Sequence, residues 1–393
     1  MARLKYRTAR TCGAWVKKVL ARFLSLSVCI FLLIACENKQ SDALSLSETE
    51  DDTSSLRIQS GQGKKAAPDY QITLPYDHLS HDAFDIEWWY LTANLQGDDG
   101  QDYAVQWTLF RFRQNTQNPL WDDGQIFMAH ASVHTQALHI FEERFAPGAL
   151  GTARVGLDEQ TQAFRMELDN WQWQGQASDG SLLPARLSVP INTDNDQEIE
   201  SLLLNLELQA QGPYILHGQA GYSVKSPEGK HASHYYSQPF IQVSGYIEVN
   251  NVQVSVSGSA WYDHEWTSTL LDETTQGWDW MSLHLDNGDK LMAFRMRLNN
   301  QKDYVTGTYI FADGAYETLL PHEISLDELH RRNDGERDLP LDWLVKIKKL
   351  NLELKVSAQK TQAYNRSIFP YYEGPVEISG SHSGKGFLEL TGY

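Results

Sequence analysis

Strict alternation of apolar and polar residues is the feature that most limits the fold of this 393-residue sequence. Residues 164–168, 204–210 and 350–356 each place every second side chain on one apolar face, and this period of two is typical of β-strands. Gly, Asp and Asn separate many such short runs, as expected of turns. A sheet with one apolar face must bury it against a second layer or close on itself. The sequence therefore predicts an all-β protein.

Two local features depart from the alternation. Residues 325–328 read Ser-Leu-Asp-Glu, and this capping-box spacing predicts a short helix that runs to about His330. The alternation also changes phase at Lys348 and Lys349, which predicts a bulge or a bend there.

Two hairpins share one sequence pattern, which indicates an internal duplication. Residues 88–95 lead through Gly-Asp-Asp-Gly to a strand that ends in Phe-Arg-Phe-Arg, and residues 278–285 lead through Asp-Asn-Gly-Asp to a strand that ends in Phe-Arg-Met-Arg. Each copy would be the first hairpin of an antiparallel β-barrel, and each barrel would have the usual size of a domain. We expect an N-terminal barrel over residues 69–245 and a C-terminal barrel over residues 246–393, with the boundary near Gly245.

The first 35 residues have the composition of a secretory signal. They carry seven Lys and Arg residues and no acid, followed by an apolar run too short for a confident membrane span. Leu-Ile-Ala-Cys at 33–36 resembles a bacterial lipobox, in which cleavage precedes Cys36 and lipid is attached to that cysteine. An uncleaved anchor with an incidental cysteine is the alternative. Residues 36–68 are rich in Ser, Asp and Glu and predict a disordered acidic tether.

Export with lipid attachment would determine the cysteine content, the net charge and the location of the mature chain. Cleavage removes Cys12 and Cys29, so no disulfide is expected, and a chain of this length can be stable through its cores alone. Loss of seven cations leaves 33 − 7 = 26 basic against 51 acidic residues, a net charge of 26 − 51 = −25, which disfavours nucleic acid as a partner. Lipid on Cys36 would hold the protein at a membrane surface. Glu37 stands where the usual sorting rule has an aspartate for inner-membrane retention, so we expect the periplasmic face of the outer membrane.

Three consecutive ionisable residues, Asp263, His264 and Glu265, lie among aromatic residues after the alternating run 252–258. Burial beside indole rings would raise a carboxyl pKa, as a general acid requires. Strand side chains alternate, so Asp263 and Glu265 share a face and His264 points away. Asp263 is the first choice for the acid and Glu265 the second. His264 would orient the acid or transfer a proton to it if a turn places the imidazole on the same side. A structural corner is an equally good explanation.

The candidate ligand-binding residues are aromatic or ionisable side chains on the matching strands. Aromatic faces stabilise a positive charge by about 1–2 kcal/mol each when desolvated, although barrel core is the stronger explanation for any single ring. These candidates are Tyr262, Trp266, Trp278, Trp280, Glu87, Trp89 and His130. For Glu87, a structural ion pair with Arg111 or Arg113 on the neighbouring strand is the stronger alternative.

Metal binding gains little support from the histidines. His130, His134 and His234 could share a site, but no cysteine or carboxylate at metal-ligand spacing completes it. We therefore expect neither a metal nor another cofactor.

Several motifs together resemble the AttH and carotenoid-hydratase-like family. They are Glu-Trp-Trp-Tyr at 87–90, Met-Ala-His-Ala at 128–131, Gly-Tyr-Ser at 221–223, Tyr-Tyr-Ser at 235–237, Trp-Tyr-Asp-His-Glu-Trp at 261–266, Gly-Trp-Asp-Trp at 277–280 and the C-terminal segment 372–393. The resemblance covers residues 69–393. It implies two tandem lipocalin-like β-barrels and export in bacteria, often beside an ABC-type export system. In the enzyme branch of the family it implies acid-catalysed addition of water to a terminal double bond of a carotenoid.

Three functions stay open at this point. The leading hypothesis is that the barrels bind or transfer an apolar ligand, either a lipid or an isoprenoid-like molecule. The second is a hydratase, isomerase or cyclase that acts on an isoprenoid-like substrate at Asp263, His264 and Glu265. The third is an accessory lipoprotein that contacts an ABC-type transporter. An enzyme needs its acid cluster to face a cavity, a carrier needs a cavity without such a cluster, and an accessory needs an exposed apolar patch.

Overall fold

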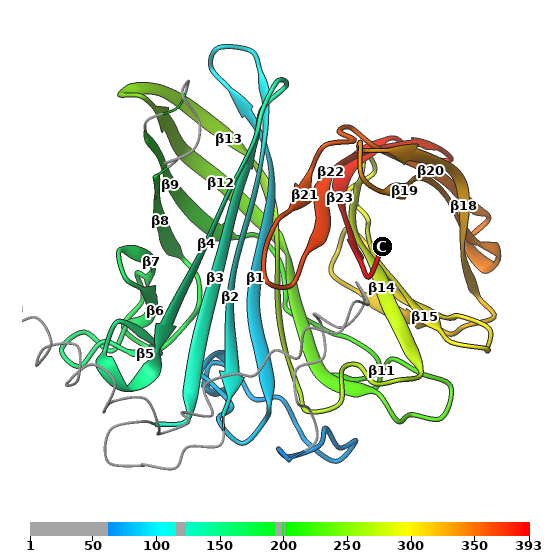
Figure 1. Cartoon of the computed structure of the whole chain (residues 1–393), viewed down its shortest axis with the longest axis horizontal. Coiled ribbons are helices and arrows are strands. Elements are labelled where there is room, and N and C mark those ends of the chain that lie inside the picture. The colour runs from blue at the N-terminus through cyan, green and yellow to red at the C-terminus, as the bar shows by residue number, and fades with distance from the viewer. Residues whose placement is uncertain (1–61, 115–122, 193–198, 200) are drawn as a thin grey trace, which may run out of the picture. The chain divides into compact units, whose positions relative to one another are not determined.

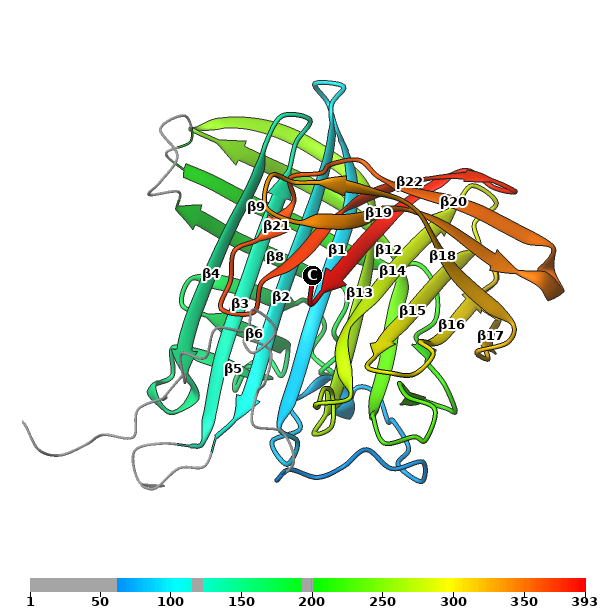
Figure 2. The same cartoon turned by 45° about the vertical axis from the view of Figure 1, so that its right-hand side comes forward.

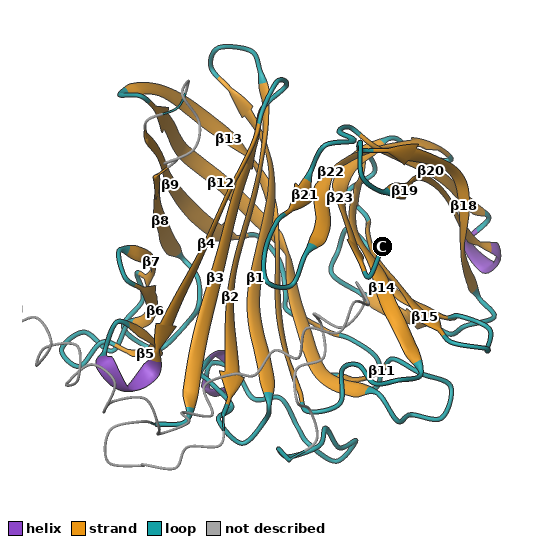
Figure 3. Cartoon of the chain, viewed as in Figure 1, coloured by secondary structure: helices purple, strands orange, loops and turns teal. Residues whose placement is uncertain are grey.

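Antiparallel β-strands make up almost all of the regular structure (Figure 3). The computed structural model describes residues 62–114, 123–192, 199 and 201–393. Its helical segments are three short 3-10 turns, η2 (Tyr76–His78), η3 (Gly148–Leu150) and η4 (Lys348–Leu350). Within these residues, no helix has the length and apolar character needed to cross a membrane. The prediction of an all-β protein is confirmed.

The first sheet has 13 strands, in the order β4-β3-β2-β1-β13-β12-β9-β8-β7-β6-β5, with β10 and β11 paired to β12 (Figure 1). Its strands are β1 (Ile86–Gly97), β2 (Asp102–Arg113), β3 (Gln125–His134), β4 (His139–Pro147), β5 (Ala153–Leu157), β6 (Phe164–Leu168), β7 (Trp171–Gly175), β8 (Ala185–Asn192), β9 (Ser201–Ala210), β10 (Ile215–Leu216), β11 (Tyr222–Val224), β12 (Ala232–Val249) and β13 (Val252–Thr267).

The second sheet has ten strands, in the order β17-β16-β15-β14-β23-β22-β20-β19-β18, with β21 paired to β22 (Figure 2). Its strands are β14 (Thr275–Leu285), β15 (Lys290–Leu298), β16 (Tyr304–Ile310), β17 (Tyr316–Leu319), β18 (Ile324–Asn333), β19 (Asp338–Ile347), β20 (Leu352–Ala358), β21 (Tyr364–Asn365), β22 (Tyr371–Gly380) and β23 (Gly384–Thr391). β16 also contacts β18, which brings the two ends of this sheet together. One nearly closed barrel and one half-barrel result, and the predicted tandem β-barrel fold is confirmed.

Gly245 does not mark the boundary between the two sheets. It lies inside β12, and both β12 and β13 belong to the first sheet. A Cβ at this position would lie 2.1 Å from the carbonyl oxygen of Asn205 on β9, and the φ angle of Gly245 is 150°. Glycine is therefore required by close strand packing and a backbone conformation that other residues rarely adopt. The chain changes sheet between Thr267 and Thr275.

The predicted helix at residues 325–330 is wrong, because these residues lie in β18 and pair with β19. Ile324 and Leu326 are buried in the core of the second barrel, and this period-two burial outweighs the local capping pattern. The phase change at Lys348 and Lys349 is a bend, formed by the turn η4 between β19 and β20.

Residues 62–68, which we predicted as the end of the tether, lie against the first sheet. The backbone N–H of Lys64 donates to the carbonyl of Ala83 (2.7 Å), and the carbonyl of Lys64 accepts from the Ser268 hydroxyl (2.8 Å). Backbone hydrogen bonds thus hold a segment that has little apolar surface of its own. The predicted signal peptide, Cys36 and the remainder of the tether lie outside the described residues.

Each barrel has its own apolar core, and a third apolar cluster contains side chains from both sheets. β1 contributes to two of these clusters, because Trp89 and Leu91 face the first core while Tyr90 and Trp88 face the second sheet. Burial on both faces explains why β1 reads as a continuous apolar run and not as an alternating one. The third cluster, around Trp261 and its partners, contains the candidate site.

Candidate functional site between the barrels

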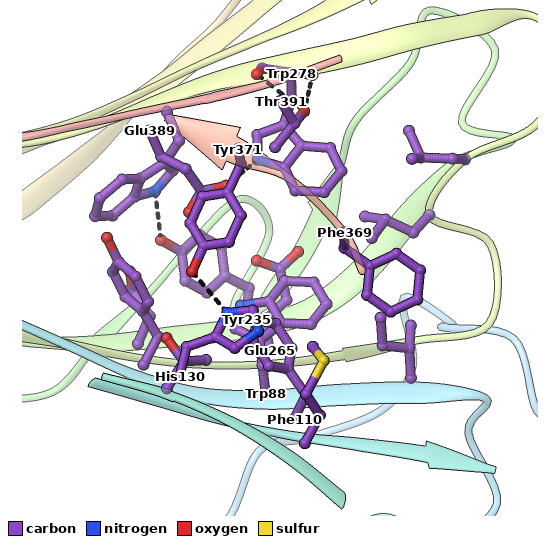
Figure 4. Close-up of a pocket in the computed structure, with 18 of the residues that line it drawn as sticks. Trp88, Phe110, His130, Tyr235, Glu265, Trp278, Phe369, Tyr371, Glu389 and Thr391 are labelled. Carbon is purple, nitrogen blue, oxygen red and sulfur yellow. Dashed lines mark hydrogen bonds between the residues drawn. The ribbon is translucent and has the colours of Figure 1, made fainter. Parts of the chain in front are cut away.

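A pocket lies between the outer face of the first sheet and the facing strands of the second (Figure 4). Aromatic side chains line it from both sheets. They are Trp88, Tyr90, Phe110, Phe112 and Tyr235 from the first sheet, Trp278, Trp280, Phe294 and Tyr371 from the second, and Phe369 just before β22. Its cavity volume is about 110 Å³. Roughly 10–15 Å³ of such volume holds one water molecule, so the pocket accommodates a small organic molecule.

Asp263 is a buried carboxyl group in this pocket without a cationic partner. It projects from β13 and is 2% exposed. Its Oδ1 accepts hydrogen bonds from the Ser237 hydroxyl and from the Trp261 indole N–H (2.7 Å). No basic side chain in the described part of the chain forms an ion pair with it. Burial raises the pKa of Asp263 to about 7, against the opposing effect of the hydrogen bonds from Ser237 and Trp261.

Glu265 lies on the same face of β13 but has a different environment. Its Oε1 forms an ion pair with Lys225 (3.0 Å) and accepts a hydrogen bond from the Ser233 hydroxyl. The ammonium of Lys225 in turn lies over the ring of Tyr235, 4.5 Å from its centroid. Among the residues that the structure describes, Asp263 has no such cation beside it, so it is the better proton donor of the two.

Two further carboxyl groups come from the C-terminal strands. Glu389 on β23 lines the pocket and accepts a hydrogen bond from the Trp278 indole N–H (2.6 Å), and burial raises its pKa to about 7. Glu373 on β22 accepts a hydrogen bond from the Tyr90 hydroxyl (2.7 Å). Burial and the nearby charge of Glu389 raise the Glu373 pKa well above its usual range. The pocket therefore combines apolar walls with carboxyl groups that hold protons near neutral pH.

His264 lies on the opposite face of β13, as the alternation predicts. Its Nε2 and Nδ1 are hydrogen-bonded to Glu87 Oε1 (2.8 Å) and to the Tyr236 hydroxyl (3.0 Å), inside the first barrel. Its ring stacks on Trp89, with centroids 4.8 Å apart. His264 therefore does not face the pocket, and its predicted place beside the reacting group has no support from the geometry.

Glu87 forms a buried ionic cluster at the end of the first barrel. Its Oε2 pairs with Nε of Arg111 (2.8 Å), as the structural alternative predicted, and its Oε1 contacts Nδ1 of His81 (2.6 Å). Burial alone would raise the Glu87 pKa, but the charge of His81 and the hydrogen bonds from His264 and His81 hold it well below its usual range. Through His81, the cluster joins the segment before β1 to His264 on β13, the strand that carries Asp263.

His81, Glu87 and His264 form a group with metal-ligand spacing in the described part of the chain, their donor atoms all within 4.8 Å of one another. Both oxygens of Glu87 already have partners, because the two imidazoles contact Oε1 while Arg111 and the backbone N–H of His81 donate to Oε2. Arg111 also supplies a positive charge beside Glu87, where a metal ion would add a second one. The group is therefore a hydrogen-bonded ion cluster, and its geometry does not fit an open metal site.

The predicted ligand-binding residues divide between two locations. Trp278, Trp280 and His130 line the pocket. Four others, Glu87, Trp89, Tyr262 and Trp266, are buried in the first barrel and do not line it.

Sequence reasoning did not select Lys225, Tyr371, Glu373 or Glu389 as site residues. The motif at residues 372–374 was a signal for one of them, but nothing in the sequence shows that β22 and β23 line one pocket with β13.

Comparisons with known proteins give the family and the fold. The AttH-like family model matches residues 65–393. The chain belongs to the AttH-like family. A crystal structure from Nitrosomonas europaea, provisionally named AttH, is 28% identical, covers 84% of this chain and 99% of its own, and superposes with a TM-score of 0.72. Kievitone hydratase from Nectria haematococca is 16% identical, covers 84% of this chain and 97% of its own, and has a TM-score of 0.58. At that identity the second likeness shows the fold alone. No curated protein matches the sequence.

Proposed function

We propose that this AttH-like protein adds water to, or isomerises, a carbon–carbon double bond of an apolar, isoprenoid-like ligand held between its barrels. One observation carries the proposal: Asp263 is a buried carboxyl group that keeps its proton near neutral pH and faces an aromatic pocket without a cationic partner. A carrier needs no such group, so the geometry favours the enzyme hypothesis over simple ligand transfer. A protein of the same fold that is named a hydratase agrees with this choice.

Protonation of the alkene would be the first step. Asp263 is the group that carries the proton, while its carboxyl group accepts hydrogen bonds from Ser237, Trp261 and Tyr235. Transfer of that proton to one alkene carbon leaves a carbocation on the other and a carboxylate on Asp263. The aromatic faces of Trp88, Trp278 and Trp280 line the same space. Each stabilises a desolvated cation by about 1–2 kcal/mol, and the new carboxylate stabilises it further.

The carbocation has two outcomes, which give two related activities. Attack by water, followed by loss of one proton from that water, gives an alcohol. Loss of a proton from a neighbouring carbon gives an isomerised alkene. Both outcomes restore the charge balance, because the proton given by Asp263 is matched by one proton released. The position of water relative to the carbocation decides between the two outcomes.

Native mass spectrometry tests the proposal. The full-length protein in detergent and its Asp263→Asn variant are each incubated with a lipid extract of the source cells, and the bound molecules are identified. We expect the wild type to release a molecule that has gained one water or has been rearranged, while the variant retains the input molecule. An unaltered apolar molecule in both proteins would establish a carrier. No bound molecule in either would favour the accessory role.

Attachment to a membrane through Cys36 is a separate part of the proposal, supported by the lipobox-like sequence before it. We place the lipid-anchored protein at the periplasmic face of the outer membrane. Cys36→Ser should release the protein into the soluble periplasmic fraction, whereas Cys29→Ser should leave it with the membrane. Equal fractionation of the two variants would remove the anchor.

A further inference from the structure

Tyr371, His130 and Glu143 form a hydrogen-bonded row that leads from the pocket toward the protein surface. Figure 4 shows the inner part of this row, the contact between Tyr371 and His130. The Tyr371 hydroxyl lies 2.9 Å from Nδ1 of His130, and Nε2 of His130 lies 2.8 Å from Oε2 of Glu143. Tyr371 and His130 line the pocket, and His130 is fully buried. The Glu143 side chain is 15% exposed, so the outer end of the row reaches solvent.

The protonation states in this row follow from its partners. Although burial acts the other way, hydrogen bonds from His130 and Ser367 lower the Glu143 pKa, so this carboxylate can only accept. Nε2 of His130 must then carry a hydrogen, which leaves Nδ1 as the acceptor for the Tyr371 O–H. Burial lowers the His130 pKa, so the imidazole is neutral and free to take a proton. The row is thus a hydroxyl, an imidazole and a carboxylate aligned for proton transfer in one direction.

Packing holds the imidazole in this orientation. Phe110 and Phe141 each meet the His130 ring edge to face, with centroids 5.2 Å apart, and the Tyr371 ring stacks beside it at 5.6 Å. Ser367 donates a hydrogen bond to the same Glu143 oxygen (2.5 Å). Such fixed geometry is what a proton relay needs and what a solvated surface histidine lacks.

We propose that Tyr371, His130 and Glu143 are the base that accepts the proton of the attacking water. This inference rests on the proposed hydration at Asp263. As the water oxygen bonds to the carbocation, its proton passes to the Tyr371 oxygen while the Tyr371 proton passes to Nδ1 of His130. Glu143 stabilises the resulting imidazolium, which then loses its proton to solvent. Asp263 supplies the first proton and the row removes the second, so the two groups have separate roles.

Because Asp263 and the Tyr371–His130–Glu143 row have different roles, variants of the two should lose different reactions. Without the Tyr371 hydroxyl the carbocation still forms at Asp263, but it returns to an alkene because the attacking water has no base. In deuterated water this return leaves deuterium on the ligand. Tyr371→Phe should therefore keep deuterium exchange within a few fold of the wild type and lose water addition by about a hundredfold or more, the usual contribution of a general base.

The experiment uses the full-length protein, the lipid extract of the source cells in deuterated water, and mass spectrometry to separate exchange from water addition. Glu143→Gln should behave as Tyr371→Phe does, because the amide can donate to Nε2 and move the ring hydrogen to Nδ1. Tyr103→Phe is the matched control, since that hydroxyl contacts Asp99 on a surface hairpin and should leave both readouts unchanged.

The outcomes distinguish the two proposals. Water addition by Tyr371→Phe at the wild-type rate would overturn the relay and leave the hydratase proposal standing. Loss of both exchange and water addition in Tyr371→Phe would also overturn it, because the residue would then act before the carbocation forms. Absence of both reactions in the wild type would overturn the hydratase proposal and the relay with it.

Discussion

Replacing Asp263 by Asn should make the protein more stable in alkaline solution, because the variant removes a carboxyl group that is costly to ionise. Burial raises the pKa of Asp263 from 3.8 to about 7. The folded state therefore binds this proton more tightly than the unfolded state, and the wild type loses stability as the pH rises from about 4 to about 7. One pKa unit corresponds to about 1.4 kcal/mol, so the full loss is (7 − 3.8) × 1.4, or about 4 kcal/mol. Asparagine carries no such penalty and still offers an oxygen to Ser237 and Trp261.

Urea denaturation of the full-length wild type and of Asp263→Asn, each at pH 5 and pH 8, measures this effect. The wild type loses this stability between pH 5 and the pKa of about 7, that is over two pH units, which amounts to about 3 kcal/mol. The stability of the variant relative to the wild type should rise by that amount. Asp158→Asn is the control. Hydrogen bonds from Thr161 lower the pKa of Asp158, and no histidine of the described residues is among its partners, so its loss should destabilise the protein equally at both pH values. A stability difference for Asp263→Asn that is the same at pH 5 and pH 8 would refute the reasoning.

The remaining predictions concern the cores and are read from urea denaturation. Arg111→Met leaves Glu87 buried without its guanidinium and should cost about 3–5 kcal/mol, whereas Arg154→Met, which breaks an exposed pair, should cost less than about 1 kcal/mol. An equal cost for the two would contradict the buried cluster. Leu206→Ala opens a cavity in the first barrel and should cost about 2–5 kcal/mol, against about 0.5 kcal/mol or less for the exposed Leu320→Ala.

Local pattern was sufficient to predict the strands and the faces of β13. The alternation at residues 204–210 and 350–356 is confirmed by β9 and β20, and Asp263 and Glu265 share a face because side chains alternate along any strand. The same local reasoning was wrong at Gly245, where glycine serves a close approach to β9. It was also wrong at residues 325–330, where burial against the second core determined the strand.

The complete pocket depends on contacts that no local pattern contains. Tyr371 and Glu389 line the same pocket as Asp263 only because the second sheet packs on the outer face of the first, across more than a hundred residues of sequence. β1 is buried on both faces, so its sequence did not show which side chains face the pocket. Only the structure shows that Trp89 on β1 lies inside the first barrel and that Trp280 on β14 lines the pocket.

The most direct test of the account is to run the reaction in water labelled with heavy oxygen and follow the product by mass spectrometry. The full-length protein is incubated with the lipid extract at several pH values, beside Asp263→Asn. We predict one heavy oxygen atom in the product, a rate that falls as the pH rises above the Asp263 pKa of about 7, and no labelled product from the variant. Two results would contradict the assignment of acid catalysis to this pocket. One is labelled product formed equally well by Asp263→Asn, and the other is a ligand that the wild type releases chemically unchanged.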